Sequence, residues 1–300
     1  MISPEGQAYY ERIHSTPSFG TNGFDLDGLR TGMATRRPPG DPQVQCLPAE
    51  VAGMPGEWVL APGADPDLRL LYLHGGGFVS GSGAFYLAMA AHLSRAGGCA
   101  VLLPDYRLAP EDPFPAALED CIAAHEWVRA NGPDGPGAAR ASFIAGDSAG
   151  GGLTLSTLLA LRDRALPLPQ AAIAISPFAD MTLSGESIRS EGEADPIMHP
   201  GCLPDFVTRY LGEADPRDPL VSPVFADYRG LPPLLVQVGE HEIIRDDSVR
   251  VADRAREAGV EVTLEVWECM FHVFQSHEPL LPEAQEAVAH IGAFIRGEAF

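Results

Sequence analysis

Lysine is absent from this chain of 300 residues, because all 20 of its basic side chains are arginines. A Walker-type phosphate loop and a Schiff-base mechanism both require a lysine amine, so the sequence excludes both. No apolar stretch reaches the ~18 residues that a membrane-spanning helix needs. The N-terminus also lacks the basic start and apolar run of a signal peptide. We therefore expect a cytoplasmic protein that does not enter a membrane.

Cysteines are few, and metal-binding patterns are incomplete. The five cysteines lie far apart in the sequence, and an odd number cannot pair fully within one chain, so we expect reduced thiols. His125 and His241 are each followed by glutamate, as at the start of a zincin helix. However, Arg129 and Arg245 stand where the second histidine is required. The sequence thus predicts no metal ion and no other cofactor.

Positive charge is also scarce. The chain has 41 acidic residues, which gives a formal net charge of -21. A field of this sign repels phosphate backbones, so nucleic acid is not expected as a partner. An acidic surface that keeps the protein in solution is enough to explain this composition. The length permits one large domain with a sizeable core.

What the sequence does contain is a series of short apolar runs separated by helical patterns. The runs at 70–74, 100–106, 142–146 and 171–176 are apolar on both faces of the pleat, which favours buried parallel strands. The helical patterns between them have proline at their starts or glycine after their ends. This alternation predicts an α/β fold with a mostly parallel central sheet flanked by helices.

Two regions interrupt the alternation. Residues 1–55 are rich in glycine and proline, and residues 180–225 contain no convincing strand. We predict that both form a helical cap over the C-terminal edge of the sheet, where ligands bind in such folds. The predicted organisation is an N-terminal cap segment, 1–55, and a catalytic domain, 56–300, that contains the cap insertion near 180–225.

The strongest chemical signal is FIAGDSAGGG, at residues 143–152. An apolar strand runs into Ser148, which has Gly146 and Gly150 two residues away on either side. A nucleophile elbow needs this composition, because only very small neighbours fit around its tight strand-to-helix turn. The helix that follows directs its N-terminal amides toward the reacting centre. A glycine-rich turn with an incidental serine is the alternative reading.

A second glycine-rich segment, HGGGF, follows the first apolar run. The spacing of its glycines does not fit the dinucleotide-binding fingerprint. Bare glycines let the backbone approach a tetrahedral intermediate. We therefore predict that the N–H groups of Gly75, Gly76 and Ala149 form an oxyanion hole. His74 is expected to shape this loop and not to act as a base.

The third segment is VWECMFHVF, at residues 266–274, in which His272 follows a strand and stands among aromatic side chains. This histidine is C-terminal both to the elbow serine and to an acidic segment. In folds with a nucleophile elbow, the catalytic residues follow one another along the chain in the order serine, acid, histidine. We predict that His272 is the general base and that nearby His277 has no catalytic role.

Taken together, these segments resemble the hormone-sensitive-lipase-like branch of the α/β hydrolases. HGGGF, DYRLAPE at 105–111, FPAALED at 114–120, GDSAG and MFHVF occur in the family's order over roughly residues 68–296. The resemblance implies an α/β-hydrolase fold with a helical cap. It also implies a carboxylesterase that acts on short acyl esters, often as a homodimer, with the nucleophile, base and oxyanion donors named above.

The triad acid lies in the segment VGEHEIIRDDS, where this chain departs from the family. The family usually has Asp-x-Leu-x-Asp here, with the first aspartate as the acid, and this frame selects Glu242. The frame that some members use instead, two residues after the glycine, falls on His241, which cannot serve as the anion. Glutamate can replace aspartate if the loop recedes by about one methylene. We predict Glu242, with Glu240 as its rival.

The predicted function is a serine carboxylesterase that cleaves a small-molecule ester through an acyl-enzyme, using Ser148, His272 and Glu242. A lactone hydrolase uses the same triad, because a lactone is an ester closed on itself, and the sequence does not separate the two. A non-catalytic receptor for a small ligand is a third possibility on this fold. A pure binder, however, has no need for both the serine and the histidine.

Overall fold

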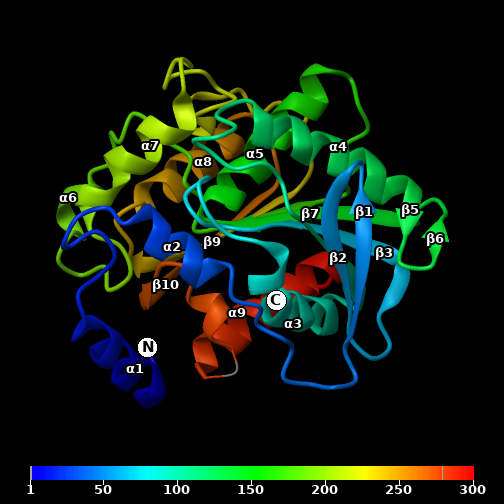
Figure 1. Ribbon diagram of the computed structural model, residues 1–300, viewed down its shortest axis with the longest axis horizontal. Coiled ribbons are helices and arrows are strands. Elements are labelled where there is room, and N and C mark those ends of the chain that lie inside the picture. The colour runs from blue at the N-terminus through cyan, green and yellow to red at the C-terminus, as the bar shows by residue number, and fades with distance from the viewer. Residues whose placement is uncertain (1, 279) are drawn as a thin grey trace.

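An eight-stranded sheet forms the centre of the molecule (Figure 1). The computed structural model describes residues 2–278 and 280–300. The strand order is β1-β2-β4-β3-β7-β8-β9-β10; β2 pairs antiparallel with β1 and β4, and the remaining pairs are parallel. The strands are β1 (Gln45–Val51), β2 (Met54–Leu60), β3 (Asp65–Leu73), β4 (Cys99–Pro104), β7 (Ala141–Asp147), β8 (Ala172–Ile175), β9 (Leu234–His241) and β10 (Val262–Phe271), with β5 (Asn131–Gly132) and β6 (Gly135–Pro136) forming a separate pair.

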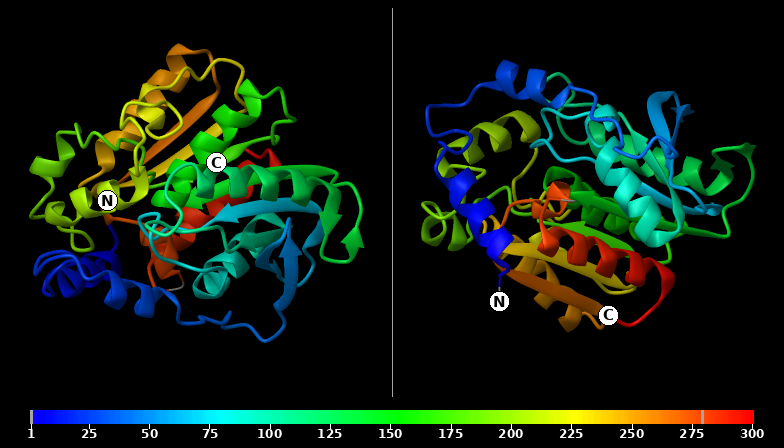
Figure 2. Two further views of the ribbon diagram at one scale, coloured as in Figure 1. Left: turned by 45° about the horizontal axis from the view of Figure 1, so that its top comes forward. Right: turned by 90° about the horizontal axis from the view of Figure 1, so that it is seen from below.

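Helices cover both faces of this sheet (Figure 2). Apolar residues of α3 and α9 pack on one face, and those of α4, α5 and α8 pack on the other. The helices are α1 (Pro4–His14), α2 (Leu26–Met33), α3 (Leu87–Gly97), α4 (Ala116–Ala130), α5 (Ala149–Asp163), α6 (Ser187–Ser190), α7 (Leu203–Leu211), α8 (Arg245–Glu257) and α9 (Pro282–Arg296), with short 3-10 turns η1 (Gly83–Phe85), η2 (Pro200–Cys202), η3 (Pro223–Phe225) and η4 (Phe274–His277). None of the described helices is both long and apolar enough to cross a bilayer.

The central strands are apolar on both sides because helices cover both sides. Every residue of β4, β7 and β8 is buried. The four apolar runs seen in the sequence fall on β3, β4, β7 and β8, so the predicted fold class is confirmed. α9 begins with Pro282 and ends at Gly297 in a left-handed conformation, as the sequence signals indicate. α8 begins at Arg245 and has Asp246 and Asp247 in its first turn.

Two chain segments that are distant in sequence pack together at one end of the molecule. α1 and α2 precede the sheet, whereas α6, η2 and α7 lie between β8 and β9 (Figure 1). Phe19 pairs with Met198 in a parallel β-bridge, and the ring of Phe24 lies 4.9 Å from that of Phe206. The sheet itself begins at Gln45, before the boundary predicted at residue 55, because β1 and β2 form a hairpin at its edge.

His125 of α4 is buried, and neither of its ring nitrogens has a hydrogen-bond partner among the described residues. Burial, assisted by the charge of Arg129, lowers the pKa of His125 to about 4. The folded pKa is therefore below the ~6.5 of an unfolded histidine. It follows that the neutral ring supports folding fully above about pH 6.5, and that this support is lost as the pH falls toward 4.

We expect His125→Leu to make the protein less sensitive to acid. Between pH 7 and pH 5, proton linkage predicts that the native protein loses on the order of 2 kcal/mol more unfolding free energy than the variant. Urea unfolding of both proteins at the two pH values measures this difference. Equal losses in the two proteins would contradict the assignment, and the difference should vanish between pH 7.5 and 9.

Candidate active site

Ser148 lies at the turn that joins β7 to α5, with φ 53° and ψ -119°. Two close backbone approaches force this geometry. A β-carbon on Gly150 would lie 1.9 Å from the carbonyl oxygen of Leu73, and one on Gly146 would lie 2.3 Å from the carbonyl oxygen of Gly150. The backbone N–H of Ser148 donates to the carbonyl of Ile175 at 2.8 Å. The strained turn is thus held by its neighbours on both sides.

The glycine-rich loop after β3 runs alongside this serine. Gly76 and Gly77 line the same cavity as Ser148. Both have positive φ angles, and a β-carbon on Gly76 would lie 2.2 Å from the carbonyl oxygen of Ser80. Ala149 is the first residue of α5, where a backbone N–H has no partner within its own helix. Gly76 and Gly77 therefore border the cavity beside the serine, and Ala149 follows the serine directly in the chain.

Gly75 has a different position from the one that the oxyanion-hole prediction gives it. Its N–H donates to Asp147 Oδ1 at 3.0 Å and approaches the hydroxyl of Tyr86 at 3.1 Å. This amide therefore anchors the loop to the elbow and is not directed at the cavity. Gly77, the third glycine of the segment, lies at the cavity in its place. Gly77 stands in the same glycine run as Gly75 and Gly76, so the sequence signal for its position is the run itself.

Asp147, which the sequence analysis gave no role, organises the region behind the elbow. Its carboxylate accepts hydrogen bonds from the hydroxyls of Tyr72 and Tyr86, at 2.8 and 2.9 Å, and from Gly75 N–H. Burial raises the pKa of Asp147 to about 6, although these hydrogen bonds act in the opposite direction. The sequence signal for this role was a lone acid at the end of an otherwise apolar strand.

The structure brings His272 and Glu242 into direct contact. Nδ1 of His272 lies 2.9 Å from Glu242 Oε2, and Glu242 is completely buried. An ionised carboxylate can only accept, so Nδ1–H is the donor and Nε2 is left free to take a proton. The other oxygen, Oε1, accepts from the Ser176 hydroxyl at 2.7 Å and from the amide of Gly239. These bonds fix both the carboxylate and the imidazole tautomer.

The surroundings of His272 favour its protonated form. Burial lowers its pKa, but the hydrogen bond and charge of Glu242, with the charges of Asp195 and Asp147, outweigh burial and leave the pKa above its ordinary value. Asp195 is itself buried, and its Oδ2 accepts from the N–H of Ile243 at 3.0 Å. The ring can therefore carry a positive charge during a reaction at modest cost.

The rival acid, Glu240, points elsewhere. Its Oε2 accepts from the backbone N–H of Cys269 at 2.9 Å. His241 lies with Nδ1 3.4 Å from the carboxylate of Glu191. Of the side chains in this acidic segment, Glu242 is the one that reaches the ring of His272.

Ser148 and His272 face one cavity of about 340 Å³. The cap supplies apolar walls from both of its segments. Its lining includes Phe19, Leu29, Ile197 and Phe206. Beside these apolar walls, the cavity contains the hydroxyl of Ser148, the imidazole of His272 and the backbone of the glycine-rich loop. Covalent acyl transfer uses groups of these kinds.

The alpha/beta hydrolase fold family matches residues 70–276 of the sequence. The match spans the glycine-rich loop, the elbow, the acidic segment and His272. This chain belongs to the α/β-hydrolase family. The mostly parallel sheet flanked by helices agrees with that membership.

Individual relatives place this hydrolase more closely. An acetyl-hydrolase from Streptomyces hygroscopicus is 42% identical over 259 residues, which cover 86% of this chain and 83% of the relative. The solved structure of EstE5, soaked by p-nitrophenyl butyrate, has a TM-score of 0.91 at 41% identity and covers 98% of both chains. An esterase from the bacterial hormone-sensitive lipase family has a TM-score of 0.88 at 43% identity and covers 99% of both. The hydrolase thus belongs to the hormone-sensitive-lipase-like branch of carboxylic ester hydrolases, and the resemblance seen in the sequence is confirmed.

We expect Glu242→Gln to lower kcat for ester hydrolysis by about 10³–10⁴-fold, because the amide no longer fixes the imidazole tautomer or stabilises its charge. Glu240→Gln is the matched control, since it alters an acid two residues away whose carboxylate accepts a hydrogen bond from a backbone amide of β10 and does not hold His272. Steady-state kinetics of both variants measures the two effects. If the Glu240 variant were the inactive one, the assignment of the acid would be wrong.

Proposed function

We propose that this hydrolase cleaves short-chain carboxylic esters through an acyl-enzyme formed on Ser148. One observation carries the proposal: a serine in a strained elbow and a histidine hydrogen-bonded to a buried carboxylate face the same apolar cavity. The solvent-accessible fraction of Ser148 is 8%, so its hydroxyl is reached through the cavity and is largely shielded from bulk water. A receptor that only binds a ligand would not need this pairing.

In the first half of the reaction, Nε2 of His272 removes the proton of the Ser148 hydroxyl as its oxygen attacks the ester carbonyl. The developing oxyanion is stabilised by the amides of Gly76, Gly77 and Ala149. A donor of this kind contributes about 2.7–4 kcal/mol in the transition state. Glu242 stays ionised and stabilises the imidazolium that forms.

In the second half, His272 gives its proton to the departing alcohol, which leaves an acyl group on Ser148. His272 then removes a proton from water, and the hydroxide equivalent attacks the acyl carbonyl carbon. The second tetrahedral intermediate collapses, releases the carboxylic acid and restores the serine hydroxyl.

The dimensions of the cavity support a short acyl chain. A volume of about 340 Å³ lies near the lower end of the roughly 300–1,000 Å³ range of small-molecule sites. Phe206 and Ile197 from the cap insertion line it. The relative EstE5 was soaked with p-nitrophenyl butyrate, an ester with a four-carbon acyl group. A small lactone has the same bond to be cleaved, so we include lactones among the test substrates.

We expect kcat/KM for p-nitrophenyl esters to be highest for acyl chains of about two to six carbons and to fall for longer chains, because the cavity volume is limited. Ser148→Ala should abolish turnover and also abolish covalent labelling by a serine-directed phosphonate. A small γ-lactone tested beside the esters distinguishes the two substrate classes. Undiminished labelling of the Ser148 variant would refute the proposed nucleophile.

We expect kcat/KM to rise with pH and to reach half its maximum above pH 6.5. Only neutral His272 acts as a base, and its pKa is raised, so activity is lost as the pH falls through that value. Asp195→Asn removes one of the negative charges that raise the pKa, and this variant should shift the midpoint to lower pH. A profile that stays level from pH 5 to 9 would contradict the general-base role.

A further inference from the structure

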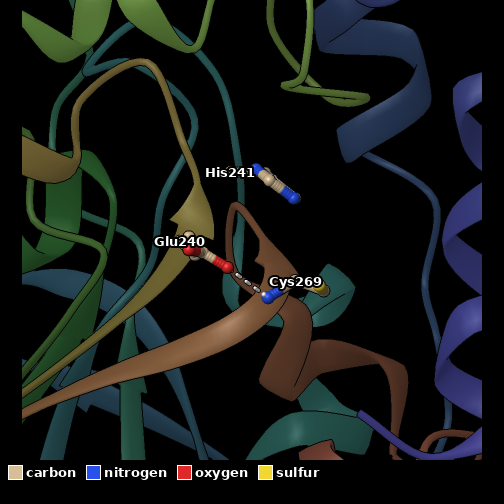
Figure 3. Close-up of side chains that lie close together, drawn as sticks. All are labelled: Glu240, His241 and Cys269. Carbon is tan, nitrogen blue, oxygen red and sulfur yellow. Dashed lines mark hydrogen bonds between the residues drawn. The ribbon is translucent and has the colours of Figure 1, made fainter. Parts of the chain in front are cut away.

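Three side chains of metal-binding type come together where β9 and β10 end. Glu240 and His241 are the last two residues of β9, and Cys269 lies near the end of β10. Figure 3 shows the carboxylate of Glu240 turned toward Cys269, with His241 nearby on the same strand. One ligand atom from each residue lies within 4.8 Å of the other two, and all three residues are half-buried.

We propose that Glu240, His241 and Cys269 bind a divalent transition-metal ion of the zinc type, with water completing the coordination. A thiolate, an imidazole and a carboxylate are all ligands that zinc accepts in proteins. Magnesium and calcium prefer oxygen ligands, so the sulfur and nitrogen donors select against them. The site is distinct from the catalytic cavity, whose lining includes none of the three residues.

The spacing of the three ligand atoms suits such an ion. The three atoms lie at most 4.8 Å apart, so a point equidistant from them lies at most about 2.8 Å from each, whereas zinc bonds measure roughly 2.0–2.3 Å. Side-chain movements of less than about 1 Å therefore close the site around an ion. The side chains are half-buried, so an ion has access from solvent.

The charges also match. A carboxylate and a thiolate together balance the two positive charges of the ion. Without an ion, burial and the charges of Glu240 and Glu268 raise the pKa of the Cys269 thiol. On binding, the thiol proton is released to solvent and the sulfur becomes a ligand as thiolate.

The residues around the three ligands hold them in place. Nδ1 of His241 lies 3.4 Å from the carboxylate of Glu191, which leaves Nε2 available to a ligand. A carboxylate behind a metal-bound histidine commonly fixes the ring in this way. Glu191 is itself paired with Arg245 at 3.3 Å, and the ring of Tyr10 from α1 lies 5.2 Å from the imidazole ring.

The sequence prediction of no metal site rested on a single-helix pattern, which this cluster does not follow. His241 and Cys269 belong to neighbouring strands, and an irregularity in β10 between Trp267 and Phe271 places Cys269 in a left-handed conformation. Glu240 and His241 immediately precede Glu242, and Cys269 lies just before His272. The ion would therefore cross-link the two chain segments that carry the proposed acid and base.

Cobalt(II) is the probe for this site, because a cobalt–thiolate bond produces a strong charge-transfer absorption in the near ultraviolet. We expect the chelator-treated protein to bind one cobalt ion with this absorption, zinc to displace it and magnesium to leave it unchanged. Cys269→Ser should abolish the absorption. Cys46→Ser, which alters the other half-buried cysteine, should retain it. Glu191→Gln should weaken zinc binding about 10–100-fold through its effect on His241.

A second measurement needs no variant. Zinc should protect Cys269 of the native protein from alkylation, as read by mass spectrometry of its peptide, while Cys46 stays reactive. Absence of the charge-transfer band, its persistence in Cys269→Ser, or alkylation of Cys269 at an unchanged rate in zinc would each overturn the proposal. These measurements involve no ester, so their outcome is independent of the proposed function.

Discussion

The fold of this hydrolase depends on a backbone contact too close for any side chain. At the end of β7 the chain turns so sharply that Gly150 passes against the carbonyl of Leu73, where a β-carbon would stand 1.9 Å away. This contact lets α5 pack against the centre of the sheet and leaves Ser148 in a conformation that L-residues rarely adopt. The glycine-rich loop after β3 then occupies the space beside the turn. The close contact between Gly150 and Leu73 therefore determines both how α5 packs on the sheet and how the backbone of Ser148 is held.

The chemistry at this turn requires buried carboxylates, and these are stabilised by hydrogen bonds from protein groups in place of water. An isolated buried carboxylate is strongly unfavourable, but Glu242 and Asp147 each accept several hydrogen bonds from named partners. Asp147 uses its bonds to hold the glycine-rich loop, whereas Glu242 uses one to hold His272. The two buried acids thus have different roles because their hydrogen-bond donors differ. Asp147 accepts from two tyrosine hydroxyls and a loop amide, whereas the donors to Glu242 include the imidazole of His272.

Sequence reasoning succeeded where a short segment is constrained by its own composition. The apolar runs gave the strands, and Gly146 and Gly150 around Ser148 gave the elbow, because few other structures tolerate those residues there. It did not foresee that Asp147 would bind the amide of Gly75, because that contact joins residues 72 positions apart. The β1–β2 hairpin was missed for a similar reason. Its half-exposed strands lack the continuous apolar pattern by which the inner strands are recognised.

The bridge between Phe19 and Met198 has a consequence for the order in which the molecule assembles. During synthesis the first segment of the cap emerges at once but has nothing to dock on until the chain has passed Met198. By then six of the eight strands of the sheet, all except β9 and β10, have already been made. Contacts between residues so distant in sequence form late, since the intervening chain must first be ordered. The two cap segments can therefore meet over Ser148 only after β8 has been made, and β9 and β10, which position Glu242 and His272, are added after that.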